Sequence, residues 1–140
     1  MRCCPLIGAG FDNGAERRYN ITMNDRDAAA LPAIVQVTAH THIAMLNTLL
    51  PDWLAGWYAV GSAALGCFDG RFSDLDFLAF VHRNPDAGEL ARLRIIHRDM
   101  GNRRLFAPLD GCYVPLDALG NRGIHGLQFN DGRFLGLAPF

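Results

Sequence analysis

The chain has 140 residues, with 13 lysines and arginines against 14 aspartates and glutamates and a formal net charge of −1. This length favours one domain, and the near-neutral charge argues against nucleic acid or an anionic membrane as a main partner. Four cysteines without CxxC spacing are interpreted as reduced thiols. The short N-terminal apolar run meets an acid by Asp12, which disfavours a signal peptide and a membrane span, so the expected compartment is the cytoplasm.

The first part of the chain predicts a helix followed by a buried strand. Residues 1–26 carry glycines and scattered charges without a sustained apolar period, so we expect a loose leader there. Over residues 27–50, apolar residues recur at near-helical spacing, which predicts a helix that Pro51 ends. The apolar run over residues 53–60 is short enough to be a buried strand, and Gly61 closes it.

The middle of the chain predicts a second strand and a second helix. The small residues Ser62, Ala63, Ala64 and Gly66 fit a brief helical turn, and a strand is expected at about residues 74–82. Asn84-Pro85-Asp86 is a good helix opening. Apolar residues over 90–100 then form one face of a helix flanked by arginines.

The last part predicts a third strand and a glycine-rich tail. Cys112-Tyr113-Val114 is typical of a short strand, which Pro115 ends or confines to a sheet edge. The tail, residues 121–140, is either a hairpin or a loop. The order helix, strand, strand, helix, strand predicts a small α/β domain over residues 27–120, with a mixed sheet flanked by helices.

Two acids one residue apart, Asp74 and Asp76, stand at the start of the second predicted strand. Side chains at i and i+2 of a strand project from the same face, so both carboxylates can converge on one cation. Hard oxygen ligands suit Mg²⁺, which is usually held by one or two carboxylates together with substrate phosphates. This pair therefore predicts metal-dependent chemistry on a nucleotide triphosphate.

Gly61 and Ser62 follow the first predicted strand and supply a small turn able to approach a phosphate. Glycine permits a backbone conformation that most side chains forbid, and the serine offers a hydroxyl and an N–H. Ser73 is a further candidate, either for orienting the loop beside Asp74 or as a plain turn residue before the strand. An Asp-Leu-Asp or a Gly-Ser alone is most often a solvated strand or a turn, so the prediction depends on their order along the chain.

Gly61-Ser62-Ala63-Ala64-Leu65-Gly66 followed by Ser73-Asp74-Leu75-Asp76 resembles the GS…G…SDxD signature of the DNA polymerase β nucleotidyltransferase superfamily. The version here is most similar to the aminoglycoside adenylyltransferase branch. The segment Leu109-Asp110-Gly111-Cys112-Tyr113-Val114-Pro115 is similar to that branch's third-strand segment, where an acid precedes a Gly-x-Tyr-x-Pro stretch. The resemblance covers roughly residues 31–120.

The resemblance implies a polymerase β-like fold and an enzyme that uses ATP and Mg²⁺, with two ions in the site. The implied reaction transfers AMP to a hydroxyl of a small acceptor such as an aminoglycoside and releases pyrophosphate. By the same resemblance, Asp74, Asp76 and Asp110 hold the metal, and Gly61 and Ser62 contact the nucleotide phosphates.

Asp110 also has a physical role independent of the family. Attack on the α-phosphate needs an acceptor hydroxyl to lose its proton, and a carboxylate near the metals either accepts that proton or completes the coordination. The alternative is an acid in a Pro-Leu-Asp-Gly turn that bonds its own backbone. Asp117 is the reserve candidate, placed beyond the strand. The five histidines lack ligand spacing with cysteine, so zinc is not expected.

The chain departs from the resembled branch after its third strand. Those enzymes resemble two-domain proteins whose helical C-terminal domain helps form the acceptor site, whereas about 25 residues follow here. Three interpretations stay open. The chain is a nucleotidyltransferase domain fragment, or it acts with a second subunit or a helical partner, as in a toxin–antitoxin pair acting on RNA or protein. In the third, it is a module that binds nucleotide or a partner without turnover.

Overall fold

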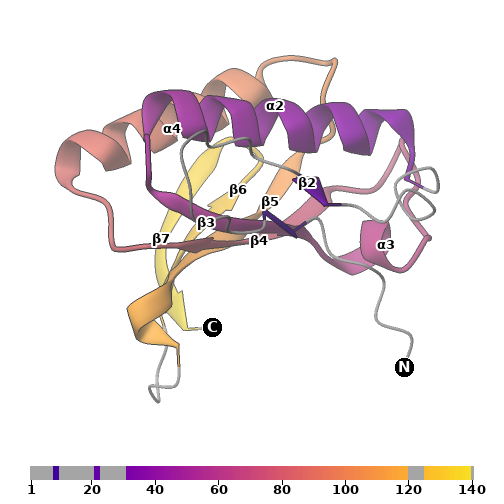
Figure 1. The fold of residues 1–140 in the computed structure, drawn as a ribbon. Helices are drawn as coiled ribbons and strands as arrows, with labels where there is room; N and C mark the ends of the chain where they lie inside the picture. The colour runs from indigo at the N-terminus through magenta and orange to yellow at the C-terminus, as the bar shows by residue number, and fades with distance from the viewer. Residues whose placement is uncertain (1–7, 10–20, 23–30, 120–124, 140) are drawn as a thin grey trace.

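The structure, a computed structural model, describes residues 8–9, 21–22, 31–119 and 125–139. Two long helices lie across one face of a five-stranded sheet (Figure 1). The helical elements are α2 (Ala33–Leu49), α3 (Gly61–Ala64), α4 (Ala87–Gly101) and the 3-10 turn η1 (Leu116–Ala118). The strands of the sheet are β3 (Leu54–Ala59), β4 (Leu75–Val81), β5 (Leu109–Pro115), β6 (His125–Asn130) and β7 (Arg133–Pro139).

The sheet is mixed and its strands are ordered β3-β4-β5-β6-β7. β5 runs parallel to β4, whereas the other neighbouring strands pair antiparallel. Parallel neighbours need a crossover connection, and α4 supplies it between β4 and β5. The expected combination of helices with a mixed sheet is confirmed.

The structure decides between the alternatives left open for Pro115 and for the tail. β5 begins at Leu109 and lies between β4 and β6, so Pro115 ends a central strand and does not confine it to an edge. A proline at the last position of a strand costs little because the ladder stops there. The tail forms the β6–β7 hairpin within the main sheet, so the hairpin alternative is correct for residues 125–139.

Little of the expected leader falls within the described residues. Within residues 1–26, β1 (Gly8–Ala9) and β2 (Ile21–Thr22) pair antiparallel as a separate two-stranded sheet. The rest of that segment lies outside the described residues, as do Cys3 and Cys4. The two described cysteines, Cys67 and Cys112, are both free thiols.

The core lies between the sheet and the two long helices. β4 alternates strictly, with every second side chain from Leu75 to Val81 buried and Asp76, Leu78 and Phe80 on the other face. Full burial of a large apolar side chain stabilises the fold by about 1.5–3 kcal/mol, so this alternation fixes the register of β4. None of the described helices is long and apolar enough to cross a membrane.

The start of α4 shows why Asn84-Pro85-Asp86 predicts a helix opening. The Asp86 carboxylate accepts a hydrogen bond from the Glu89 N–H at 2.8 Å, and the Glu89 carboxylate accepts one from the Asp86 N–H at 2.9 Å. This reciprocal pair is a capping box. Hydrogen bonds from the Arg83 guanidinium and then from the Asp86 N–H lower the pKa of Glu89 to about 2.

Two histidines in the core share the hydroxyl of Tyr113. His42 Nε2 lies 2.8 Å from that oxygen and His97 Nε2 lies 2.7 Å from it. The Trp57 indole N–H donates to His42 Nδ1 at 3.2 Å, which assigns the His42 proton to Nε2. His42 then donates to the tyrosine oxygen, and the tyrosine hydroxyl donates to His97. Among the described residues, His97 Nδ1 has no hydrogen-bond partner.

These histidines are expected to make the fold sensitive to mild acid. Burial, together with the neighbouring His97, holds the pKa of His42 well below its usual value, and burial lowers the pKa of His97 to about 3. Below about pH 6.5 the unfolded chain therefore takes up protons that the folded chain cannot. We expect the free energy of unfolding to fall by up to about 3 kcal/mol between pH 6.5 and 5, measured by urea titration.

The exposed His40 on the same helix provides the control for this pH dependence. The variant His40→Gln should retain the same loss of stability between pH 6.5 and 5. A free energy of unfolding that stays flat across this range in the wild type would contradict the assignment of two neutral, buried histidines.

Candidate active site

Asp76 and Asp110 are direct neighbours on adjacent parallel strands. The β4–β5 register pairs Asp76 with Asp110, so their side chains lie on the same face of the sheet. This is the face opposite the helices, because the flanking residues Leu75 and Phe77 are buried in the core. Neighbouring strands are about 4.8 Å apart, which brings the two carboxylates within reach of one ligand.

The carboxylates of this cluster influence one another electrostatically. Burial raises the pKa of Asp76, and the negative charges of Asp110 and then of Asp74 raise it further. Asp74 lies one residue before β4 and is exposed, so it stands at the edge of the site rather than on the strand itself. The three acids predicted from the sequence thus gather at one end of β4.

Gly61 brings the Gly-Ser turn against the Asp76 carboxylate. Its φ is +61°, and a Cβ at this position would collide with the Asp76 carboxylate oxygen Oδ2. The preceding N–H, that of Val60, donates to the Asp76 carbonyl oxygen at 2.9 Å. The two motifs that the sequence separates by about a dozen residues therefore meet in space. Only glycine combines this backbone conformation with the space that the carboxylate needs.

Ser62 and Ser73 differ in their surroundings. Ser62 is half-buried within α3, directly after Gly61. Ser73 closes the loop before β4, since its hydroxyl accepts a hydrogen bond from the Asp69 N–H at 2.9 Å. The Ser73 N–H in turn donates to the Asp69 carbonyl oxygen at 2.8 Å. These contacts favour the interpretation of Ser73 as a turn residue.

The alternative that placed Asp110 in a turn is wrong, because Asp110 is the second residue of β5. Its carboxylate oxygen Oδ2 accepts a hydrogen bond from the Asn130 side-chain amide at 2.7 Å. Asp117 lies beyond β5 in η1 and is exposed. The acid beside Asp76 is therefore Asp110.

Asn130 belongs to the site although the sequence analysis does not single it out. The sequence does indicate that Asn130 ends a strand, because the Asp131-Gly132 dipeptide that follows it is typical of a two-residue hairpin turn. What the sequence lacks is the pairing of β6 with β5, which brings Asn130 opposite Asp110. Such pairing depends on tertiary structure.

Asp76 and Asp110 are the residues of the cluster that could hold a metal ion. Among the described residues, no group of three or more His, Cys, Asp or Glu side chains is arranged to hold a metal by itself. Asp76 and Asp110 nevertheless offer two hard carboxylates, and their mutual repulsion is what a bound cation relieves. Mg²⁺ commonly takes one or two protein carboxylates and completes its shell with phosphate oxygens and water.

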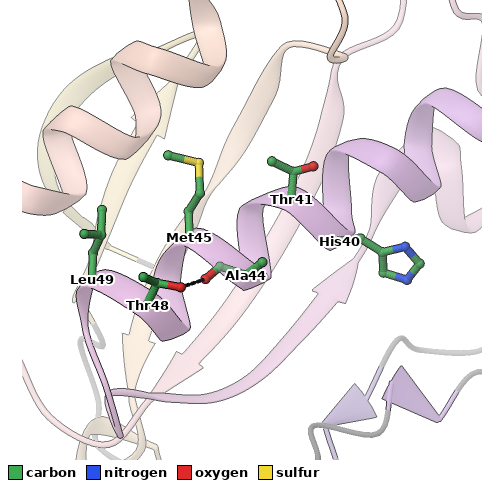
Figure 2. A pocket seen from close by; sticks show the side chains of 6 residues that line it. All are labelled: His40, Thr41, Ala44, Met45, Thr48 and Leu49. Carbon is green, nitrogen blue, oxygen red and sulfur yellow. Dashed lines mark hydrogen bonds between the residues drawn. The ribbon is translucent and has the colours of Figure 1, made fainter.

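A shallow hollow of about 490 Å³ lies on the outer face of α2, on the other side of the sheet from these acids. Figure 2 shows the six side chains that line it. They are mostly apolar or small, and the Thr48 hydroxyl donates to the Ala44 carbonyl oxygen at 2.8 Å. The lining residues are His40, Thr41, Ala44, Met45, Thr48 and Leu49. The hollow carries no acid and does not adjoin the cluster at β4.

No protein-family model matches the chain, and no curated protein sequence matches it.

Proposed function

We propose that the chain is a Mg²⁺-dependent nucleotidyltransferase with a polymerase β-like fold. In this proposal it transfers AMP from ATP to a hydroxyl of a small acceptor, such as an aminoglycoside, and releases pyrophosphate. One observation carries the proposal. The Gly-Ser turn and the paired acids of the resembled signature come together with a third acid at one end of β4.

The topology also supports the proposed fold. β3 and β4 are antiparallel and are connected through α3, and β4 then connects to the parallel β5 through α4. This order places Gly61, Asp76 and Asp110 next to one another although about fifty residues separate the first from the last. If Asp74 and Asp76 only formed the solvated face of a strand, the fold would not need to bring Gly61 and Asp110 next to them.

The residues have distinct roles in the proposed reaction. Asp74 and Asp76, with Asp110 beside them, hold Mg²⁺, which when bound offsets the charge of the triphosphate. Gly61 leaves the Asp76 carboxylate the space that it needs beside the nucleotide phosphates, and Ser62 donates to a phosphate oxygen. Asp110 either accepts the proton of the attacking hydroxyl or completes the metal's ligands. The hydroxyl then attacks the α-phosphorus, and the bond to pyrophosphate breaks.

The acceptor side of the site is the less defined part of the proposal. Residues 125–139 add β6 and β7 to the sheet. They therefore do not form the helical domain with which the resembled branch completes its acceptor site. A second subunit or a helical partner remains an alternative source of that surface.

Removal of the metal tests the nucleotide half of the site. We expect isothermal titration to detect ATP binding in Mg²⁺, and no binding after Mg²⁺ is replaced by EDTA. The variant Asp74→Asn should weaken Mg²⁺-dependent binding, because one carboxylate near the ion loses its charge. ATP binding that is indifferent both to Mg²⁺ and to this substitution would contradict the proposal and favour a metal-independent binding module.

A further inference from the structure

Asn130 makes a direct contact with the third acid of the candidate site. Its side-chain Nδ2 donates to Asp110 Oδ2 at 2.7 Å, and the β5–β6 register places the two residues opposite each other. Hydrogen bonds between an amide and an ionised carboxylate are short and directional. The contact therefore fixes the rotation of the Asp110 carboxylate.

The backbone around Asn130 is held from two sides. Asn130 ends β6, and the next two residues turn the hairpin with positive φ values of 40° for Asp131 and 79° for Gly132. The Asp131 N–H donates to the Leu109 carbonyl oxygen at 2.9 Å, which ties the turn to β5. Gly132 packs on α4, where a Cβ would lie 3.2 Å from the His97 carbonyl oxygen.

This support makes Asn130 suited to orienting a neighbour. A carboxylate has two oxygens, and the amide of Asn130 occupies one of them. The other oxygen of Asp110 is left for a proton or a metal ion beside Asp76.

We propose that Asn130 is a positioning residue that holds Asp110 in the orientation needed for AMP transfer. The inference rests on the proposed function for its reaction, whereas the contact that it assigns is independent of turnover. Side chains that orient a ligand or base through a hydrogen bond typically change activity by about 10–100-fold when removed.

Gln128 provides a matched control on the same strand. It lies two residues before Asn130 on the same face of β6, opposite Cys112 rather than Asp110. We expect Asn130→Ala to lower kcat for pyrophosphate release from ATP, with a mixture of aminoglycosides as acceptors, by about 10–100-fold. The KM for ATP should change less than kcat, and Gln128→Ala should leave both near the wild-type values.

A double-variant comparison separates positioning from a general structural effect. In the Asp110→Asn background, Asn130→Ala should cause little further loss, because the group that Asn130 positions has already been changed. The variant Asn130→Leu removes the donor without adding a charge, keeps a side chain of similar size, and serves if Asn130→Ala folds poorly. An unchanged kcat in folded Asn130 variants, or an equal further loss in the Asp110→Asn background, would overturn the inference.

A second readout keeps this inference distinct from the proposed function. In NMR spectra, the Asn130 side-chain amide signals should shift when Mg²⁺ and α,β-methylene-ATP are added to the wild type, and not in Asp110→Asn. If the wild type releases no pyrophosphate, the proposed activity fails. A shift of these signals then still supports the part of the inference that is independent of turnover, that Asn130 orients Asp110 beside the bound metal and nucleotide, and absence of a shift overturns it.

Discussion

Replacing Asp76 by asparagine is expected to reduce AMP transfer by about 1,000-fold or more. Asp76 lies between the other two parts of the site: Gly61 packs against its carboxylate, and Asp110 is its partner on the neighbouring strand. Stabilisation of transferring phosphoryl groups by a bound metal amounts to several kcal/mol, and about 4 kcal/mol corresponds to a 1,000-fold change in rate. The assay is transfer of label from α-labelled ATP.

The same substitution should not unfold the protein. Burial and the charges of Asp110 and Asp74 raise the pKa of Asp76, so the ionised side chain is disfavoured in the folded state. Neutral asparagine relieves this repulsion, and the free energy of unfolding of Asp76→Asn should equal or exceed that of the wild type. Asp99→Asn, which changes an acid at the end of α4, is the control and should retain full transfer. Equal activity of Asp76→Asn and the wild type would refute the metal-binding role.

Replacing Gly61 by alanine should disable the site through geometry alone. The added Cβ collides with the Asp76 carboxylate, so that carboxylate must move. Displacement of a reacting group by about 1 Å can lower a rate by about 100-fold. Alanine at a φ of +61° also strains the backbone, at a cost of about 1–2 kcal/mol. We expect transfer activity to fall by about 100-fold in Gly61→Ala, and Mg²⁺-dependent ATP binding to weaken as well.

Gly66 separates these two effects. Its φ is +72°, which is close to that of Gly61, but a Cβ there meets nothing within 4 Å. Gly66→Ala should therefore lose about as much stability as Gly61→Ala while its folded form keeps transfer near the wild-type rate. If both variants lose activity equally, the contact between Gly61 and Asp76 is not what the site requires.

The secondary structure was largely predictable because local signals agree with the fold. The apolar run from Leu75 to Val81, interrupted only by Asp76, predicts a strand, whereas the alternation of its buried and half-buried side chains is seen only in the structure. The opening of α4 depends on Asp86 and Glu89, which lie three residues apart and form the capping box locally. Such elements need no knowledge of distant contacts.

Contacts between distant segments were only partly predictable. The sequence predicts Asp74 and Asp76 as a pair, but it leaves Asp110 open between a turn and the sheet because the β4–β5 register is a tertiary property. The contact between Asn130 and Asp110 depends on the next pairing in the sheet.

The buried histidines show the same limit. Spacing along the chain predicts no zinc site for them but does not reveal that Tyr113 joins His42 to His97. The three residues come from α2, α4 and β5, and only the packed core brings them together.

The most direct test of the central claim is a transfer assay with the wild-type chain. The protein is incubated with Mg²⁺, α-labelled ATP and separate acceptors: a panel of aminoglycosides, a tRNA pool and a protein extract. The account predicts labelled AMP on an aminoglycoside, with an equal amount of pyrophosphate released and no reaction in EDTA. Label on RNA or protein instead would assign the site to a different acceptor, and absence of label on every acceptor would contradict the proposed activity.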